Sequence, residues 1–338
     1  MNTRSETFKR FAEKECRGSS DLYEHLSSRI SEDEEILELS GYAREGQPVP
    51  NLLLGAVHYL LLKGYQHPLK EYYPSMVSRP KDYQEAFLPF KGFCREYKEE
   101  IRHLLETKLV QTNEVRRCAY LFPAFSFVYE KMNKPLALIE IGTSAGLQLM
   151  WDHYSYAYGT GEIYGNIDST VKLTAELKGD DTPNLQQGTP PVSRRIGLDL
   201  HINNLADEED YLWLNALIWP EHEDRRQVFE KAAEYVKASS IDFIEGDGIE
   251  LLPHIAGEIP EDSVLCVFHT HVANQIPIEG KKKLFKEIQT IAGKRDIVHI
   301  YNNMKDRELH LDYYIEGMEH KNTIGMTDGH GRWFEWKI

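Results

Sequence analysis

The sequence has 338 residues, of which 41% are hydrophobic and 28% charged, and it carries a formal net charge of -15 at pH 7. A chain of this length and composition can bury a sizeable core, and it has room for one large or two ordinary globular domains. The acidity argues against general binding of DNA or RNA, because phosphate backbones are bound by cationic surfaces.

The start of the chain and its cysteines bear on where the protein works. Met1–Ser5 lead into a charged stretch without the apolar segment of a signal peptide, and no apolar run approaches the length of a membrane span. The four cysteines lack the C-x-x-C spacing of zinc or redox motifs, which is typical of a reducing compartment. We therefore expect a soluble, cytoplasmic protein that does not associate with a membrane.

Residues 1–133 are expected to form a helical region. Ser20 supplies the chemistry of a helix N-cap for a helix that follows it. Residues 52–62 are nearly all apolar, and a helix that is apolar on every side is buried, so this one should lie at the centre of the region. Pro123 should kink or shorten a further helix predicted over residues 115–129.

Residues 134–338 have the pattern of strands alternating with helices. Short apolar runs of this kind indicate a parallel sheet covered by helices on both faces. The segment at about 154–197, rich in Tyr, Gly, Thr and Pro, interrupts this rhythm and should be a β-rich insertion. After a turn at 328–331, the strand predicted over 332–336 should close one edge of the sheet as part of an antiparallel hairpin. The predicted strands of the sheet are 136–141, 241–244, 264–268 and 297–301.

The strongest local signal is the sequence Glu-Ile-Gly-Thr-Ser-Ala-Gly at residues 140–146, between a predicted strand and a predicted helix. Small residues let the backbone turn sharply and approach a ligand, and N–H groups at a helix start favour a carboxylate or another polar group. The pattern is similar to motif I of class I methyltransferases, E/D-x-G-x-G-x-G, with a serine in the middle glycine's place. A plain tight turn between strand and helix is the alternative. The residues expected to bind S-adenosylmethionine here are Glu140, Gly142, Thr143, Ser144 and Gly146.

The same residues also spell G-x-S-x-G, the nucleophile elbow of α/β-hydrolases. Ser144 would then be the nucleophile. Two features disfavour this hypothesis. In α/β-hydrolases the elbow follows several strands of the sheet, whereas the region upstream here is helical. In addition, no glycine-rich oxyanion loop precedes the motif. A dinucleotide fingerprint fits worse, because the G-x-G-x-x-G spacing is absent. The partners of a hydrolase triad would be Asp199 or Asp247 as the acid and His269 or His271 as the base.

Two aspartates follow predicted strands and are further candidates for the cofactor. Asp199 could end the second strand and accept hydrogen bonds from ribose hydroxyls, although the insertion places it unusually far from the glycine turn. Asp247 follows the third strand, where an acid would meet the adenine amino group. Asp247 could equally be a cap for the next helix.

His269, Thr270 and His271 end the fourth predicted strand, and Asn274 follows. Strand ends of a parallel sheet face the ligand crevice, so His269 and Asn274 are expected to face the methyl acceptor, with a histidine as general base. His269 and His271 would share one side of an extended strand, but no third ligand is suggested by spacing, so no metal site is predicted. A hydrogen-bonded structural histidine is the alternative.

Segments along most of the chain resemble a bacterial family, the domain of unknown function 2332. The resemblance implies a Rossmann-like class I methyltransferase-type sheet and S-adenosylmethionine as cofactor, and it supplies no substrate. It also draws attention to Gln111, Asn113 and Glu114 as residues that would reach into the crevice toward the substrate, together with His271; a helix cap by Thr112 or Asn113 is the alternative. The matching segments are Gly18–Ser20 with Leu22 and Tyr23, Gln47–Asn51, Gln111–Glu114, Glu140–Leu147 with Tyr154 and Tyr156, Gly197–Asp199, Trp213 and Leu214 with Trp219 and Pro220, Gly246 and Asp247, His269 and Thr270, and His330–Trp333.

Taken together, the sequence predicts an α/β protein in which an N-terminal helical region covers a Rossmann-like, class I methyltransferase-type sheet. The predicted activity is methyl transfer from S-adenosylmethionine to a small-molecule acceptor, a reaction that needs mainly positioning and sometimes a base. Non-catalytic binding of S-adenosylmethionine or another nucleoside is the second hypothesis, ahead of serine hydrolysis by Ser144.

Overall fold

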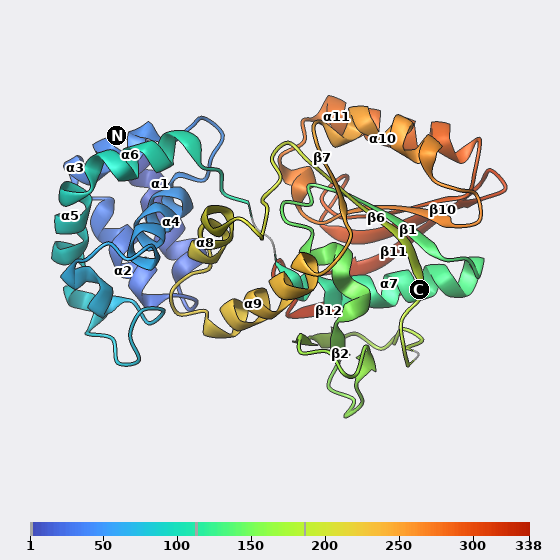
Figure 1. The fold of residues 1–338 in the computed structure, drawn as a ribbon, viewed down its shortest axis with the longest axis horizontal. Helices are drawn as coiled ribbons and strands as arrows, with labels where there is room; N and C mark the ends of the chain where they lie inside the picture. The colour runs from blue at the N-terminus through green and yellow to red at the C-terminus, as the bar shows by residue number, and fades with distance from the viewer. Residues whose placement is uncertain (1–2, 112–113, 186) are drawn as a thin grey trace. The chain divides into compact units, whose positions relative to one another are not determined.

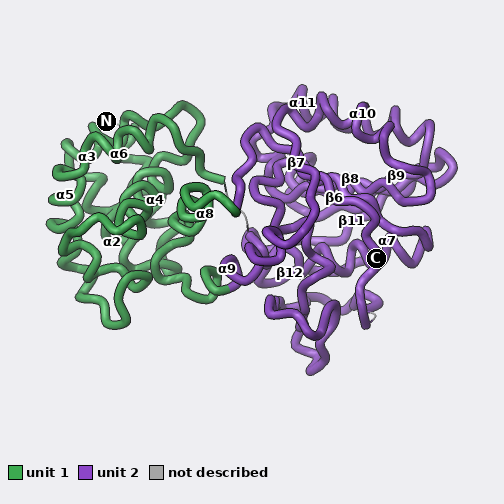
Figure 2. The backbone as a smooth tube through the Cα atoms, in the orientation of Figure 1, with its two compact units in different colours: residues 1–112, 206–227 green, residues 113–205, 228–338 purple. Residues whose placement is uncertain are grey.

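The computed structural model describes residues 3–111, 114–185 and 187–338. The chain forms two compact units, each assembled from two stretches of sequence (Figure 2). The helical unit contains residues 1–112 and 206–227, and the α/β unit contains residues 113–205 and 228–338. The units therefore do not follow the division at 133 expected from the sequence, because the helix before the first strand belongs with the sheet and a later segment returns to the helical unit.

Helices supply nearly all the regular structure of the helical unit. Ser20 caps α2 as predicted, since its side chain accepts a hydrogen bond from the Tyr23 N–H at 3.0 Å. The predicted central helix is α4, in which nearly every residue is buried. The helices are α1 (Thr3–Phe11), α2 (Asp21–Ile30), α3 (Glu34–Leu39), α4 (Val49–Leu62), α5 (Phe87–Glu96), α6 (Lys98–Thr107) and α8 (Glu208–Ala216), with α9 (Glu223–Lys237) divided between the two units.

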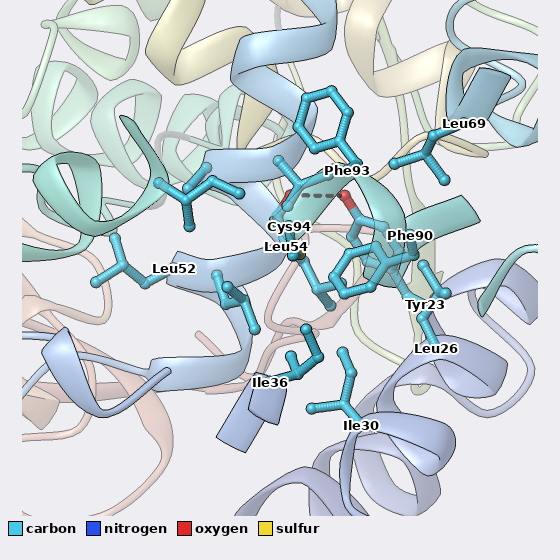
Figure 3. Packing of buried hydrophobic residues seen from close by; sticks show 14 of the residues in the cluster. Tyr23, Leu26, Ile30, Ile36, Leu52, Leu54, Leu69, Phe90, Phe93 and Cys94 are labelled. Carbon is cyan, nitrogen blue, oxygen red and sulfur yellow. Dashed lines mark hydrogen bonds between the residues drawn. The ribbon is translucent and has the colours of Figure 1, made fainter. Parts of the chain in front are cut away.

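The core of the helical unit is a single apolar cluster. Figure 3 shows side chains from several of its helices pointing toward one another, and the dashed line marks the hydrogen bond that the Tyr23 hydroxyl donates to the Leu54 carbonyl oxygen at 3.5 Å. Trp213 and Ala216, from the returning segment, complete this core. The Trp213 indole N–H donates to the Leu109 carbonyl oxygen at 2.8 Å, so α8 is held by a polar bond as well as by packing.

A seven-stranded sheet forms the centre of the α/β unit. Its order is β11-β10-β9-β8-β1-β6-β7, in which the five strands from β9 to β7 are parallel and β10 is antiparallel to both of its neighbours. The chain builds outward from β1 through β6 to β7 and then crosses back to β8 and β9, so the strand order reverses between β1 and β8. Ligands of open α/β sheets bind at the carboxyl ends of the strands beside such a reversal. The strands are β1 (Leu136–Ile141), β6 (Val192–Asp199), β7 (Asp242–Glu245), β8 (Val264–His269), β9 (Ile297–Tyr301), β10 (Glu308–Ile315) and β11 (Met318–Met326).

Helices cover both faces of this sheet (Figure 1). Ile139 of β1 and Val267 of β8 lie in one buried cluster with side chains of α10 (Gly248–Glu258) and α11 (Ile278–Ala292). Successive side chains of a strand point to opposite faces. Phe268 therefore points to the other face, where its ring packs edge-on against Phe125 of α7 (Cys118–Met132) at a centroid distance of 5.3 Å.

The connection from β1 to β6 contains the predicted β-rich insertion. The α-helix predicted after the glycine turn is wrong, because residues 147–153 form the 3-10 helix η6 (Leu147–His153), which is kinked at Met150. Tyr154, Tyr156 and Tyr158 are buried, and the Tyr158 hydroxyl donates to the Ala119 carbonyl oxygen at 2.7 Å, so these tyrosines are core residues. The insertion's strands are β2 (Ser155–Ala157), β3 (Tyr164–Gly165), β4 (Lys172–Thr174) and β5 (Glu176–Lys178).

Two further expectations for the α/β unit need correction. The C-terminal strand β12 (Trp333–Glu335) forms one antiparallel bridge across the predicted turn, between Thr327 and Phe334, but it does not close an edge of the large sheet. It pairs in parallel with β5, and the antiparallel edge hairpin is β10–β11. Pro123 does not interrupt its helix, because α7 continues from Cys118 to Met132 with Pro123 inside it. Among the described residues, no helix has the length and apolar character needed to cross a membrane.

Candidate functional site

The glycine turn lies directly after β1 and is held against β6. The N–H groups of Gly142 and Thr143 both donate to the Leu198 carbonyl oxygen, at 2.7 and 3.2 Å. Gly142 and Gly146 have φ values of +77° and +76°, which side chains rarely allow. A Cβ at Gly142 would lie 2.5 Å from a methyl of Val272, and one at Gly146 would lie 2.8 Å from the Phe243 ring. Both glycines are thus required by the protein's own packing, as in the plain tight turn.

Two buried amides of this turn are nevertheless left without acceptors. Ala145 and Leu147 are fully buried, and within the described ranges their N–H groups donate no hydrogen bond. Buried backbone donors are rarely left unpaired, so such groups commonly serve a ligand. The turn therefore combines internal packing with two donors that a polar ligand could use.

Glu140 is a buried carboxyl group at the end of β1. It is 2% exposed, and its Oε2 accepts a hydrogen bond from the Thr143 hydroxyl at 2.7 Å. Burial raises the pKa of Glu140 to about 8; the Thr143 hydrogen bond lowers this pKa, Asp199 raises it and Arg117 lowers it. An acid with this pKa holds its proton at neutral pH and would release it to accept a cation.

Asp199 ends β6, as predicted, and lies beside the glycine turn. Its Oδ2 accepts the Ser144 N–H at 2.7 Å, and its Oδ1 accepts the His201 N–H at 3.3 Å. Burial raises the pKa of Asp199, although these backbone hydrogen bonds to its charged form lower it. The structure thus brings Glu140 and Asp199 to the two sides of one turn at the carboxyl ends of adjacent strands.

Ser144 is positioned by Asn203. Ser144 has a φ of +53°, its carbonyl oxygen accepts the Asn203 N–H at 3.0 Å, and its hydroxyl accepts from the Asn203 side-chain amide at 3.1 Å. Within the described part of the chain, no histidine forms a hydrogen bond with Ser144. The geometry gives no specific support to the hydrolase hypothesis, which needs a histidine in that position.

Asp247 lies after β7 and caps the next helix. Its side chain accepts the Ile249 N–H at 2.9 Å, and it is the N-cap residue of α10. This is the structural role considered in the sequence. Any contact with adenine would be an additional role for the same carboxylate.

His269 lies on the other face of the sheet from Glu140. Alternation along β8 puts His269 on the side of Val267, which faces α10 and α11. It is fully buried, and its Nε2 forms a hydrogen bond with Nε2 of His299 at 3.2 Å. Burial lowers the pKa of His269 to about 3, and Lys281 lowers it further. In the structure, His269 is thus a core histidine that the described contacts do not connect with the glycine turn.

His271 and Asn274 follow β8 in a turn. His271 adopts a φ of +64°, and its N–H donates to Oδ1 of Asn302 at 2.8 Å. The two histidines therefore do not share one side of an extended strand, because the chain reverses between them. Asn274 ends the 3-10 helix η7 (Val272–Asn274) and is exposed. Among the described residues, no group of three or more His, Cys, Asp or Glu side chains is arranged to hold a metal ion.

The segment before α7 reaches a different place than expected. Gln111 belongs to the helical unit, and Asn113, like Thr112, lies outside the described residues. Glu114 is buried in the α/β unit, where its Oε1 accepts the Arg116 N–H at 3.1 Å and its Oε2 lies 3.4 Å from Nδ1 of His330. Glu114 thus joins the first helix of this unit to the C-terminal turn.

Sequence reasoning missed the residues that connect these segments. Arg117 Nε donates to the Gly329 carbonyl oxygen at 2.9 Å, and its Nη1 donates to the Thr270 hydroxyl at 3.4 Å. Thr270 in turn donates to Oε1 of Gln148 at 2.9 Å, directly after the glycine turn. A Cβ at Gly331 would lie 2.5 Å from the Arg116 carbonyl oxygen, which explains a glycine there. The available signal was the resemblance, because Glu114, Thr270 and His330 all belong to its matching segments.

A family model described as an uncharacterized protein conserved in bacteria, DUF2332, matches residues 5–336. No curated protein and no solved structure matches the chain. The match covers nearly the whole sequence, and the chain belongs to this family.

Proposed function

We propose that this member of the DUF2332 family binds S-adenosylmethionine at the carboxyl ends of β1, β6 and β8 and transfers its methyl group to a small-molecule acceptor. The observation that carries the proposal is Glu140, a buried acid beside a glycine turn at the reversal of strand order, whose pKa is raised to about 8. A buried carboxyl group that contacts no cation among the described residues favours a ligand that brings one. S-adenosylmethionine carries two, its ammonium and its sulfonium.

The topology supports the same proposal. Numbered along the chain, the parallel strands β7-β6-β1-β8-β9 have the order 3-2-1-4-5 of doubly wound nucleotide-binding sheets. We accordingly propose a Rossmann-like sheet of the class I methyltransferase type. Two features depart from that pattern: a 3-10 helix and small sheets replace the helix after β1, and the hairpin β10–β11 forms the far edge.

Each residue of the turn has a role that its geometry allows. Glu140, once deprotonated, would accept the ligand's ammonium. Asp199, at the carboxyl end of β6 beside the turn, would accept hydrogen bonds from the ribose hydroxyls. The N–H groups of Ala145 and Leu147 would donate to ligand oxygens. The bound cofactor supplies an electrophilic methyl group, and catalysis then depends mainly on how the acceptor is positioned.

Calorimetric titration with S-adenosylmethionine and S-adenosylhomocysteine tests the proposal. We expect both to bind the wild-type protein, and Asp199→Asn to weaken both by at least about tenfold, which is about 1.4 kcal/mol, because the ribose loses an anionic acceptor. Asp199→Asn is preferable to substitution of Gly142, whose Cβ would collide with Val272. Asp242→Asn is the matched control, since Asp242 begins the neighbouring strand β7 and pairs at the surface with Arg194 at 2.9 Å.

Failure of the wild-type protein to bind either ligand would overturn the proposal. Binding with no S-adenosylhomocysteine produced from a pool of small metabolites would favour the hypothesis of a non-catalytic binding protein.

A further inference from the structure

The cluster beyond the glycine turn contains a buried positive charge that no carboxylate of the described residues contacts, although the charge of Arg117 acts on Glu140 from a distance and lowers its pKa. Arg117 is 5% exposed, and among the described residues its side chain donates two hydrogen bonds, to Gly329 and Thr270. A guanidinium group has five N–H donors, so most of its donor capacity is unused. Among the described residues, Arg117 forms no ion pair within the limiting distance of 4.0 Å. A buried cation is stable when an anion pairs with it, and the protein supplies none in contact.

His271 points independently to a ligand at the same cluster. Its left-handed backbone is strained for a histidine, and the hydrogen bond to Asn302 maintains it. Its Nε2 is buried and makes no hydrogen bond. Burial lowers the pKa of His271 to about 3, and the nearby charges of Arg117 and His330 lower it further. A neutral imidazole can donate one N–H to an acceptor.

The C-terminal turn borders this cluster. The His330 side chain is 44% exposed, while its Nδ1 lies against the buried carboxylate of Glu114. Asp328 accepts the His330 N–H at 3.1 Å and fixes the turn.

We propose that Arg117 and His271 bind an oxyanion, a carboxylate or phosphate group, of the methyl acceptor, so that the substrates are small organic acids. This inference rests on the proposed function. There the cofactor's ribose lies at Asp199 on β6 and its ammonium at Glu140 on β1. Thr270 and His271 follow β8, the next strand beyond β1, so the anion site lies past the cofactor's amino-acid end, where an acceptor would approach.

The test uses histidine-ring NMR on the full-length protein saturated with S-adenosylhomocysteine. Acetate and inorganic phosphate are titrated separately at constant ionic strength, with chloride as the reference anion. We expect at least one of the two to shift the His271 ring signal saturably. The apparent affinity, followed on the His330 ring signal, should fall at least about tenfold, or 1.4 kcal/mol, in Arg117→Met and in His271→Asn. Arg116→Met, at the neighbouring arginine, should leave it unchanged.

If Arg117→Met does not fold, His271→Asn still tests the proposal, because asparagine tolerates the left-handed conformation at position 271. Absence of a saturable shift with both anions overturns the proposal, as does an unchanged affinity in His271→Asn. The proposal is also overturned if both variants weaken the binding of S-adenosylhomocysteine but not that of 5′-methylthioadenosine. The second ligand lacks the carboxylate of the first, so this result would show that Arg117 binds the cofactor's carboxylate. Anion binding without any S-adenosylhomocysteine binding would refute the proposed function and leave the anion site standing.

Discussion

Both units bury an arginine, and the two guanidinium groups are treated differently. In the helical unit, Arg226 donates to the side chain and the carbonyl oxygen of Asn215 and lies 3.8 Å from Glu223. In the α/β unit, Arg117 has one backbone carbonyl and one distant hydroxyl as acceptors and no ion pair among the described residues. The first arginine joins the start of α9 to the end of α8 and has acceptors for both of its terminal nitrogens, although its Nε is buried without a hydrogen bond. Among the described residues, the second has no acceptor for its Nη2.

The carboxyl groups of half-buried Glu221 and buried Glu140 differ in the same way. Glu221 of the helical unit accepts the Ser20 hydroxyl at 2.7 Å and the Leu22 N–H at 2.8 Å, so both of its oxygens serve the start of α2. Glu140 of the α/β unit accepts one hydroxyl, from Thr143.

Two buried histidines, one from each unit, also differ in their hydrogen bonds. In the helical unit, both ring nitrogens of His58 form hydrogen bonds, with the Ala216 carbonyl oxygen at 2.9 Å and the Ser75 hydroxyl at 2.8 Å. His269 has its Nδ1 buried without a partner. These groups of the helical unit are thus more completely bonded than their counterparts in the α/β unit, although other buried atoms of the helical unit, such as the hydroxyls of Ser27 and Tyr73, also lack a hydrogen bond. Unused buried capacity is what a binding site requires before its ligand arrives.

The two arginines should contribute very differently to the free energy of unfolding. Arg226→Met should lower the free energy of unfolding by about 4 kcal/mol, because it leaves buried acceptors without their donor. Arg117→Met should change it by less than about 1 kcal/mol, since removing an uncompensated buried charge offsets the two hydrogen bonds lost. Urea unfolding measures both, and equal losses in the two variants would remove the distinction between the units.

The effects of the two carboxyl groups on the free energy of unfolding should also differ, and this difference should depend on pH. The pKa of Glu140 is raised from 4.5 to about 8, so between these pH values the folded protein holds a proton that the unfolded chain has released. Its contribution to stability therefore declines as pH rises through that window. Glu140→Gln should be more stable than the wild type by about 5 kcal/mol above pH 8 and nearly equal to it at pH 4.5.

Glu221→Gln is the matched variant in the helical unit. It should be less stable by about 1 kcal/mol, because one of the two donors loses its acceptor. Urea unfolding at a series of pH values checks both variants. A difference between Glu140→Gln and the wild type that does not change with pH would contradict the assignment of this titration to Glu140.

The histidine pair gives the smallest contrast. His58→Leu should cost about 2 kcal/mol at pH 8 and His269→Leu about 1 kcal/mol, in proportion to the hydrogen bonds lost. Burial lowers the pKa of both histidines to about 3, so stability is lost as pH falls below the unfolded value of 6.5. Each variant should reduce that slope by about 1.4 kcal/mol per pH unit, as measured by unfolding at acidic pH. A slope that neither variant changes would show that other groups cause the acid sensitivity.

Local signals in the sequence were enough for the main elements of the fold. The apolar runs at 136–141 and 297–301 became parallel strands, and Ser20 became a cap, because each depends on a few neighbouring residues. The residue after His269 was harder. An extended strand was expected to continue to His271, but the bond to Asn302, 31 residues away, holds that residue in a left-handed turn.

The polar cluster depends even more on distant contacts. Arg117 meets Thr270 and Gly329 across 153 and 212 positions of sequence, and no spacing rule links them. The 3-10 helix after Gly146 was predicted as an α-helix because its apolar residues suit either form. Side-chain types therefore identified the strand ends as the candidate site, while the partners of each side chain there became known only from the fold.

The division of the helical unit between residues 1–112 and 206–227 has a consequence for biosynthesis. Trp213 and Ala216 belong to the core of that unit, yet a ribosome makes them only after it has made the first two strands of the large sheet. At typical rates of translation the first segment waits about 10 s for them, with its apolar surface incompletely covered. Nascent-chain folding of the helical unit should therefore be completed late, and this interval is when the protein most needs a chaperone.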